Sequence, residues 1–320
     1  MWGTPLPSGD LAAVSAFRQE DWDSLLVLAR EQTVTGLLYR AVELLPEDVE
    51  VPSETLLRLI GAADRIRRGN QAIARVSEPL LRDLRTQGFH PVVLKGSMCA
   101  ARYPQPELRE SGDIDLYLPP EEFDAAVRFL ETGGTPSTGS PDNSSHFKID
   151  GLDIDLHRHY FDLHSKENRL PPVPSEAAEL LMLSAHILKH ATGTGVGLRQ
   201  CCDMATAVKA CQTSPETLEH YFRQTGTWRW NCLLYSFLED AFCVSSPFPK
   251  TDPSPLRSIL LKGGNFGHYA TSRTRRLALS PLRRKADTAF RILRNLPFSL
   301  HYAPRETLLR ITDLTKGNTR

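Results

Sequence analysis

The chain has 320 residues, of which 41% are hydrophobic and 24% are charged. This composition is typical of an ordinary globular protein and excludes disordered and fibrous classes, while the length suggests roughly two domains. Lysine plus arginine and aspartate plus glutamate both number 38, so the formal net charge is zero. The average charge therefore neither favours nor excludes an anionic partner.

Residues 1–86 are predicted to form an N-terminal helical region. From Leu11 onward, apolar side chains recur at the spacing of an amphipathic helix. A further helix is expected from Ser53 to Arg85, because the apolar stripe continues to that point and Gly88 then favours a stop.

Residues 87–170 are predicted to form a small α/β core, because the hydrophobic period changes there. A helix is expected from Pro120 to Glu131, and the Gly- and Ser-rich segment 133–145 is expected to be a loop. Asp150-Gly151 is typical of a hairpin turn. The predicted strands share short apolar or alternating patterns and cover residues 91–94, 113–118, 147–149 and 152–157.

The proline-rich segment 171–174 is predicted to be a stiff linker, and the chain after it is helical in pattern. Ser175 begins this part with the signature of a capped helix. Residues 175–320 are therefore predicted to form a C-terminal helical domain with a basic tail. Taken together, the pattern predicts an α+β chain in which a small core is flanked by two helical regions.

The basic tail is the strongest charge feature of the chain. Residues 256–320 contain 14 basic and 3 acidic residues, a net charge of +11 that the rest of the chain balances. Such a run usually marks a solvated helix face, but it is also the footprint of a surface for nucleic acid or for an acidic partner. Its central basic residues are Arg273, Arg275, Arg276, Arg283, Arg284, Lys285, Arg291 and Arg294.

The cysteines and the N-terminus indicate the cellular compartment. The six cysteines form no CxxC pair and show no zinc spacing, which is typical of free thiols in a reducing compartment. Residues 1–11 lack the basic and apolar stretches of a signal peptide. No window approaches the ~20 apolar residues of a membrane span. We therefore expect a cytoplasmic protein with no membrane span.

Aspartates in the predicted core indicate a cation site. Asp113 and Asp115 lie two positions apart on one strand, so their side chains share a face. Carboxylate oxygens are ligands for Mg²⁺, usually together with the phosphates of a nucleotide. Asp155 supplies a third carboxylate from the hairpin, and Asp153, two positions earlier on the same face, is an alternative to it.

Lys95-Gly96-Ser97 indicates a phosphate site just upstream. A strand that ends in Gly-Ser and opens a helix, here expected over residues 98–103, presents backbone N–H groups and a hydroxyl to an anion. Gly96 permits a close approach of the backbone, and Ser97 is a candidate phosphate contact. Lys95 or Arg109 would offset the negative charge.

In this order, the motifs resemble the uncharacterised nucleotidyltransferase family of the polymerase-beta superfamily. The resemblance covers the chain from about Leu57 to its end. In the core it depends on Leu94-Lys95-Gly96, Tyr103-Pro104, Arg109, Gly112-Asp113-Ile114-Asp115-Leu116, His146 and Asp155-Leu156-His157. In the helical part it depends on His186, His190, Gly197-Leu198-Arg199-Gln200, Asp203 and Gly263-Gly264-Asn265-Phe266-Gly267.

The resemblance implies a polymerase-beta-like core, a short mixed sheet with helices, that binds a nucleotide triphosphate such as ATP. It implies that Asp113, Asp115 and Asp155 hold two Mg²⁺ or Mn²⁺ ions, and that the third carboxylate accepts a proton. Asp153 keeps the identity of the third acid open, and Asp155 is preferred because Asp-Leu-His is the family-like string. The implied nucleotide-binding residues are Lys95, Gly96, Ser97 and Arg109.

The remaining polar motifs have alternative interpretations. His186 and His190, one helical turn apart, have a spacing that can bind zinc but more often marks hydrogen-bonded histidines on a helix face. Arg199 and Asp203 are expected to form an ion pair within a helix or to contact substrate. The accessory site candidates are Asp153, His146, His157, His190, Arg199 and Asp203.

The sequence thus favours a metal-dependent nucleotidyltransferase that moves a nucleoside monophosphate from an NTP to an unidentified acceptor. A protein, a peptide or a small-molecule hydroxyl is the expected acceptor. One alternative is transfer to a nucleic-acid end that the basic tail would bind. Another is a catalytically silent adaptor, against which the intact set of three aspartates argues. A sugar-nucleotide transferase is disfavoured because no large nucleotide-binding domain precedes the Asp-x-Asp motif.

Overall fold

The structure is a computed structural model, and it describes residues 8–133, 138–139, 144–164, 170–193, 195–263 and 294–315. In this part of the chain, no helix has both the length and the hydropathy that a membrane span requires. The basic residues from Arg273 to Arg291 and residues 264–267 of the glycine-rich motif lie outside the described residues. Binding of nucleic acid or an acidic partner by this tail therefore stays a prediction.

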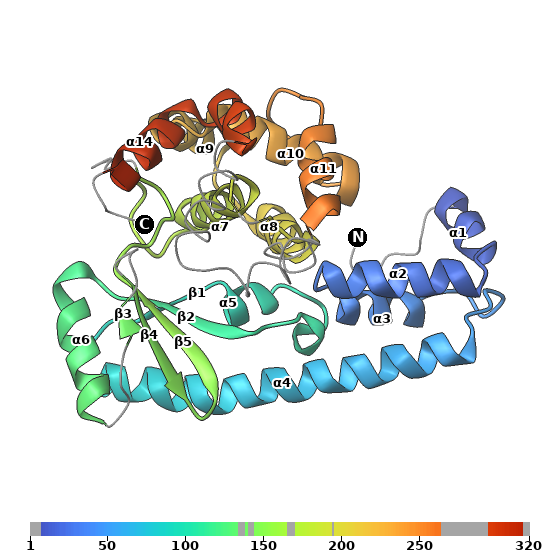
Figure 1. Cartoon of the computed structure of the whole chain (residues 1–320), viewed down its shortest axis with the longest axis horizontal. Coiled ribbons are helices and arrows are strands. Elements are labelled where there is room, and N and C mark those ends of the chain that lie inside the picture. Colours follow the sequence, from blue (N-terminus) through green and yellow to red (C-terminus); the bar gives the residue numbers. More distant parts are fainter. Residues whose placement is uncertain are drawn as a thin grey trace.

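The N-terminal region is helical, as predicted. Its helices are α1 (Ser8–Ser15), α2 (Gln19–Glu31), α3 (Thr35–Glu43) and α4 (Ser53–Thr86). Helix α4 is a long rod that runs along one edge of the molecule, from the other N-terminal helices to the sheet (Figure 1). Gly36 of α3 lies so close to the backbone of Leu108 that a Cβ there would be 2.1 Å from its carbonyl oxygen, so this contact requires glycine.

The core contains a mixed five-stranded sheet, as the α+β prediction requires. Its order is β1-β2-β5-β4-β3. Strands β2 and β5 pair in parallel, and the other neighbours pair antiparallel. The strands are β1 (Val92–Leu94), β2 (Asp113–Tyr117), β3 (Thr138–Gly139), β4 (Ser144–Ile149) and β5 (Leu152–His157).

The β4–β5 hairpin is confirmed at its predicted turn. Asp150 and Gly151 both have positive φ, 50° and 81°, as a two-residue turn of the favoured hairpin type needs. The loop predicted over 133–145 is partly wrong, because it contains β3 and the first residues of β4. The polar residues that begin β4, Ser144 and Ser145, show no alternation in sequence and become strand by pairing with β5.

Two short helices frame the sheet. Helix α6 (Pro120–Thr132) is confirmed to within one residue and packs Phe123 and Ala126 into the apolar core under the strands. Helix α5 (Gly96–Ala100) begins and ends earlier than the predicted 98–103. A proline disfavours the helical conformation of the residue before it, and Tyr103 precedes Pro104. The helix therefore ends before Tyr103, and the chain then forms the short helix η1 (Pro106–Leu108).

The C-terminal region is helical, as predicted, and lies over the face of the sheet opposite α4 (Figure 1). Ser175 caps the central helix by accepting a hydrogen bond from the N–H of Ala178 at 3.1 Å, and residues 294–302 are also helical. Leu94 and Cys99 of the core belong to the same apolar cluster as the C-terminal helices. These helices are α7 (Glu176–Ala191), α8 (Leu198–Ala210), α9 (Pro215–Gln224), α10 (Trp228–Phe242), α11 (Ser254–Gly263) and α14 (Pro304–Thr315).

Candidate metal and nucleotide site

The strand register brings the predicted acids together on one face of the sheet. In the parallel pair of β2 and β5, Asp113 lies opposite Asp153 and Asp115 lies opposite Asp155. On the other side of β5, His146 of β4 lies opposite Asp155. Because side chains alternate along a strand, all of these residues point to the same face.

A cavity of about 250 Å³ lies above this face, closed on the opposite side by α7 and α8. It gathers most of the residues singled out from the sequence. Ser97 and Asp153 are not among its lining residues. The predicted residues that line it are Lys95, Gly96, Arg109, Asp113, Asp115, His146, Asp155, His157, His186, His190, Arg199 and Asp203.

Asp115 is a buried, firmly held carboxylate. It is 6% exposed, and its Oδ1 lies 3.1 Å from Lys95 Nζ and 2.7 Å from His157 Nε2. Burial alone would raise the pKa of Asp115, but Lys95 and the hydrogen bond from His157 hold it well below its ordinary value. Asp115 is therefore ionised at neutral pH.

Asp113, two positions earlier, has a different environment. It is exposed at the end of β2, and its carboxylate makes no hydrogen bond or salt bridge with any residue that the structure describes. Desolvation raises the pKa of Asp113, repulsion from Asp115 raises it further, and Lys95 acts in the opposite direction. The two acids of the Asp-x-Asp motif are therefore not equivalent.

Asp155 and Asp153, the two candidates for the third acid, also differ. Asp155 Oδ1 forms a hydrogen bond with His146 Nδ1, and the side chain lines the cavity. The side chain of Asp153 is 68% exposed and forms a surface ion pair with Lys148 at 3.5 Å. The position of Asp155 therefore agrees with its choice as the third acid, which stays a prediction.

The donor set of this site fits a divalent cation. One ligand atom each from Asp115, Asp155 and His157 can be chosen such that all three lie within 4.8 Å of one another. Carboxylate oxygens and an imidazole nitrogen are ordinary ligands for such ions.

Comparison with known protein families identifies the family of the chain. A family model described as an uncharacterised nucleotidyltransferase matches residues 18–242, which is more than half of the chain. The chain belongs to this nucleotidyltransferase family. The matched segment contains all of the cavity-lining residues and ends before the basic tail. No curated protein and no solved structure has significant similarity to the chain.

In this member of the family, the segment that is predicted to contact phosphate forms a strained turn that leads into the short helix α5. Lys95 and Gly96 both have positive φ, 54° and 46°, which is costly for a side chain like that of lysine. The turn aims Lys95 at Asp115 and exposes Ser97 to solvent. Burial alone would lower the pKa of Lys95, but Asp115, Asp162 and Asp113 raise it, so this side chain is charged.

Arg109 is part of the cavity wall and is fully engaged there. Its Nε and Nη2 donate to the two carboxylate oxygens of Asp203 at 3.0 and 2.6 Å, and its Nη1 donates to Ser111 Oγ at 2.9 Å. Tyr103 also donates to Asp203, at 2.8 Å. The salt bridge of Asp203 is therefore with Arg109 of the core and not with Arg199, so the ion pair within the helix is wrong.

Arg199 lines the cavity beside this pair. Its Nη1 donates to the carbonyl of Glu110 at 2.7 Å, and its buried Nε has no hydrogen-bond partner among the described residues. Burial and repulsion from Arg109 lower the pKa of Arg199. Arg199 therefore adds positive charge to the wall of the cavity near Asp113.

The sequence analysis missed two residues, Asp162 and Lys189, in the cavity wall beside α7. Asp162, which follows β5, accepts from Lys189 Nζ at 2.8 Å and lies 3.0 Å from His186 Nδ1. Burial alone would raise the pKa of Asp162, but Lys189 and His186 hold it well below its ordinary value. The one available signal was the spacing of Lys189, which puts it on the same face of α7 as His186. His186 thus forms a hydrogen bond at the cavity, as the more common interpretation predicted, and the ring of His190 lies against that of His186 with 4.5 Å between the ring centroids.

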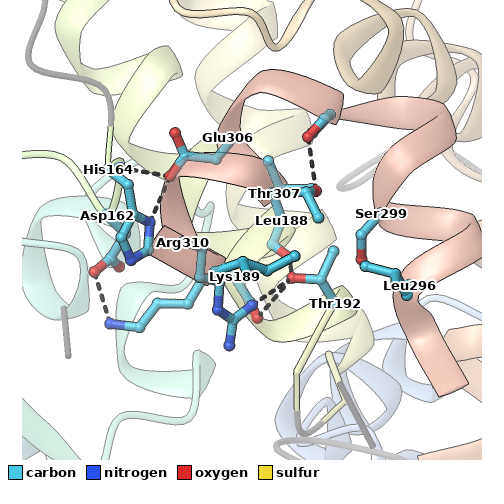
Figure 2. A pocket seen from close by; sticks show the side chains of 12 residues that line it. Asp162, His164, Leu188, Lys189, Thr192, Leu296, Ser299, Glu306, Thr307 and Arg310 are labelled. Atoms are coloured by element: carbon cyan, nitrogen blue, oxygen red, sulfur yellow. Dashed lines mark hydrogen bonds and ion pairs between the residues drawn. The ribbon is translucent and has the colours of Figure 1, made fainter. Parts of the chain in front are cut away.

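Asp162 and Lys189 also line a second, smaller cavity of about 40 Å³ under α14. Figure 2 shows the contacts that fasten α14 there. Glu306 accepts from His164 Nδ1 at 2.7 Å, and Arg310 donates to Thr192 Oγ1 at 3.0 Å. The C-terminal helix thus packs directly behind the residues that build the wall of the larger cavity.

Proposed function

We propose that this protein transfers a nucleoside monophosphate from an NTP to a hydroxyl group of a protein, a peptide or a small molecule. The observation that carries the proposal is the register that puts Asp115 beside Asp155 in a cavity that also holds Lys95. Family membership supports the same reaction class. Mg²⁺ or Mn²⁺, held by Asp113, Asp115 and Asp155, would stabilise charge on the attacking and leaving oxygens.

The chain's own residues have distinct tasks in this proposal. Lys95 is charged and lies at the turn beside Gly96, so it is placed to bind the negative phosphates. The acceptor oxygen forms a bond to the α-phosphorus, the bond to the bridging oxygen breaks, and pyrophosphate leaves. Asp155 takes the proton of the acceptor hydroxyl, and its hydrogen bond with His146 fixes its orientation.

The test is label transfer from NTPs. The purified protein is incubated with a cell lysate, Mg²⁺ and each α-labelled NTP in turn, beside Asp155→Asn and an Asp113→Asn/Asp115→Asn double variant. We expect transfer with at least one NTP and its loss in both variants. Asp153→Asn is the matched control, because this exposed carboxylate lies on the same strand but outside the cavity. Transfer that persists in the double variant would contradict the proposal.

A further inference from the structure

One nitrogen donor distinguishes the trio Asp115, Asp155 and His157 from a purely acidic metal site. Its three ligand atoms lie within 4.8 Å of one another. Asp113 is not a member of this trio. The nitrogen donor and the position of Asp113 outside the trio together indicate that the site selects among metal ions and that it can bind a metal before the nucleotide.

We propose that Asp115, Asp155 and His157 form a cation site that binds Mn²⁺ in preference to Mg²⁺, and does so before any nucleotide enters. The proposal deepens the function proposed above, which gives the cation its place in the reaction. Its test, however, is a direct measurement of metal binding and needs no turnover.

The site is organised before a metal arrives. Its three residues lie on the adjacent strands β2 and β5, whose pairing fixes their backbone positions. Lys95 and His157 both contact Oδ1 of Asp115, and His146 contacts Oδ1 of Asp155. Such contacts orient carboxylate ligands and are typical around metal centres.

The nitrogen donor sets the preference. Mg²⁺ binds through oxygen ligands and keeps several waters, whereas imidazole favours transition-metal ions and carboxylates suit Mn²⁺. Two carboxylates and one imidazole therefore fit Mn²⁺ better than Mg²⁺. On binding, the metal takes the place of the hydrogen that His157 Nε2 and Asp115 Oδ1 share, and the neutral ring then carries its proton on Nδ1.

Asp113 is expected to act later. It is exposed, lies outside the trio and makes no hydrogen bond with the described residues that would orient it. A cation held by Asp113 would have few protein ligands, so it needs the phosphates of the nucleotide to complete its coordination. The first metal should therefore bind without Asp113, and the second should arrive with the NTP.

The experiment is a titration of the full chain with Mn²⁺ in the absence of nucleotide, followed by the loss of the electron paramagnetic resonance signal of free Mn²⁺. Competition with Mg²⁺ gives the selectivity. We expect Asp115→Asn and Asp155→Asn to abolish binding, and Asp113→Asn and Asp153→Asn to retain it. In His157→Gln, which replaces the nitrogen by an oxygen donor, the Mn²⁺ affinity should fall by about tenfold or more while that for Mg²⁺ changes little.

A second measurement needs no variant of His157. Electron spin echo modulation of the Mn²⁺-loaded wild type should show a nitrogen coupling that persists in His146→Gln. The proposal is overturned if Mn²⁺ does not bind without nucleotide or if Asp113→Asn abolishes its binding. It is also overturned if no nitrogen coupling is found, or if His157→Gln lowers the affinities for Mn²⁺ and Mg²⁺ equally. Mn²⁺ binding without any nucleotide transfer would instead leave this proposal standing and contradict the proposed reaction.

Discussion

The two faces of the central sheet have opposite compositions on the same strands. On one face, Ile114 and Ile154 are buried in an apolar core with α4 and α6. On the other, Asp115 and Asp155 line the polar cavity under α7 and α8. Strand alternation alone produces this division, because neighbouring residues point to opposite faces. One face stabilises the fold, and the other is available for chemistry.

The polar face also contributes to stability, at the contact between the core and the helical domain. Arg109 and Asp203 are both about as buried as the residues of the apolar face, at 4% and 3% exposed. Their charges are paired in two hydrogen bonds. The two sides of the sheet therefore stabilise the fold in different ways. Burial of apolar area does so on one side, and a buried ion pair does so on the other.

The largest expected effect on stability is at this pair. Asp203→Asn keeps the size of the side chain but leaves the Arg109 guanidinium buried without its counter-charge, which should lower the free energy of unfolding by about 3–5 kcal/mol. Urea denaturation measures this loss. The double variant Arg109→Met/Asp203→Leu should lose less than the single one, because it removes both charges. If the single variant lost under ~1 kcal/mol, the pair would be no stabilising element of the polar face.

Two adjacent residues of β5, Ile154 and Asp155, test the two faces separately, with a smaller expected effect on stability. Ile154→Ala should lower the free energy of unfolding by about 2–5 kcal/mol, because it leaves a cavity in the apolar core. Asp155→Asn, one position further, should change stability far less and instead reduce nucleotide transfer. Denaturation and transfer assays on both variants test this. Equal losses of stability in the two variants would mean that the faces do not divide these tasks.

The sequence predicted the division of faces well, because it follows from short-range alternation in 113–117 and 152–157. It predicted less well what depends on distant partners. Strand β3 and the start of β4 are polar and become strand only by pairing. Asp162 and Lys189 lie far apart in the chain and meet only when α7 docks over the sheet. Asp203 likewise forms its salt bridge with Arg109 of the core and not with Arg199 of its own helix.

The smallest expected effect is the pH dependence of stability. The buried cluster of the apolar face contains no titratable residue among those described, so the pH dependence reports on the other side of the sheet. Burial and the charge of Lys95 lower the pKa of His186 to about 4 from its ordinary value of 6.5. Between these two values the unfolded chain binds a proton that the folded protein does not, so the free energy of unfolding falls as the pH falls. The slope from this one group is at most about 1.4 kcal/mol per pH unit.

Below pH ~4 the loss should continue, because Asp115 and Asp162 have lowered pKa values and must be protonated against their ion pairs. Urea denaturation at about pH 7, 5.5 and 4.5 measures the upper window. His186→Gln should flatten the decline there, whereas His220→Ala, an exposed position on α9, should leave it unchanged. A wild-type protein of constant stability across this window would mean that the fold does not hold His186 neutral at the wall of the cavity.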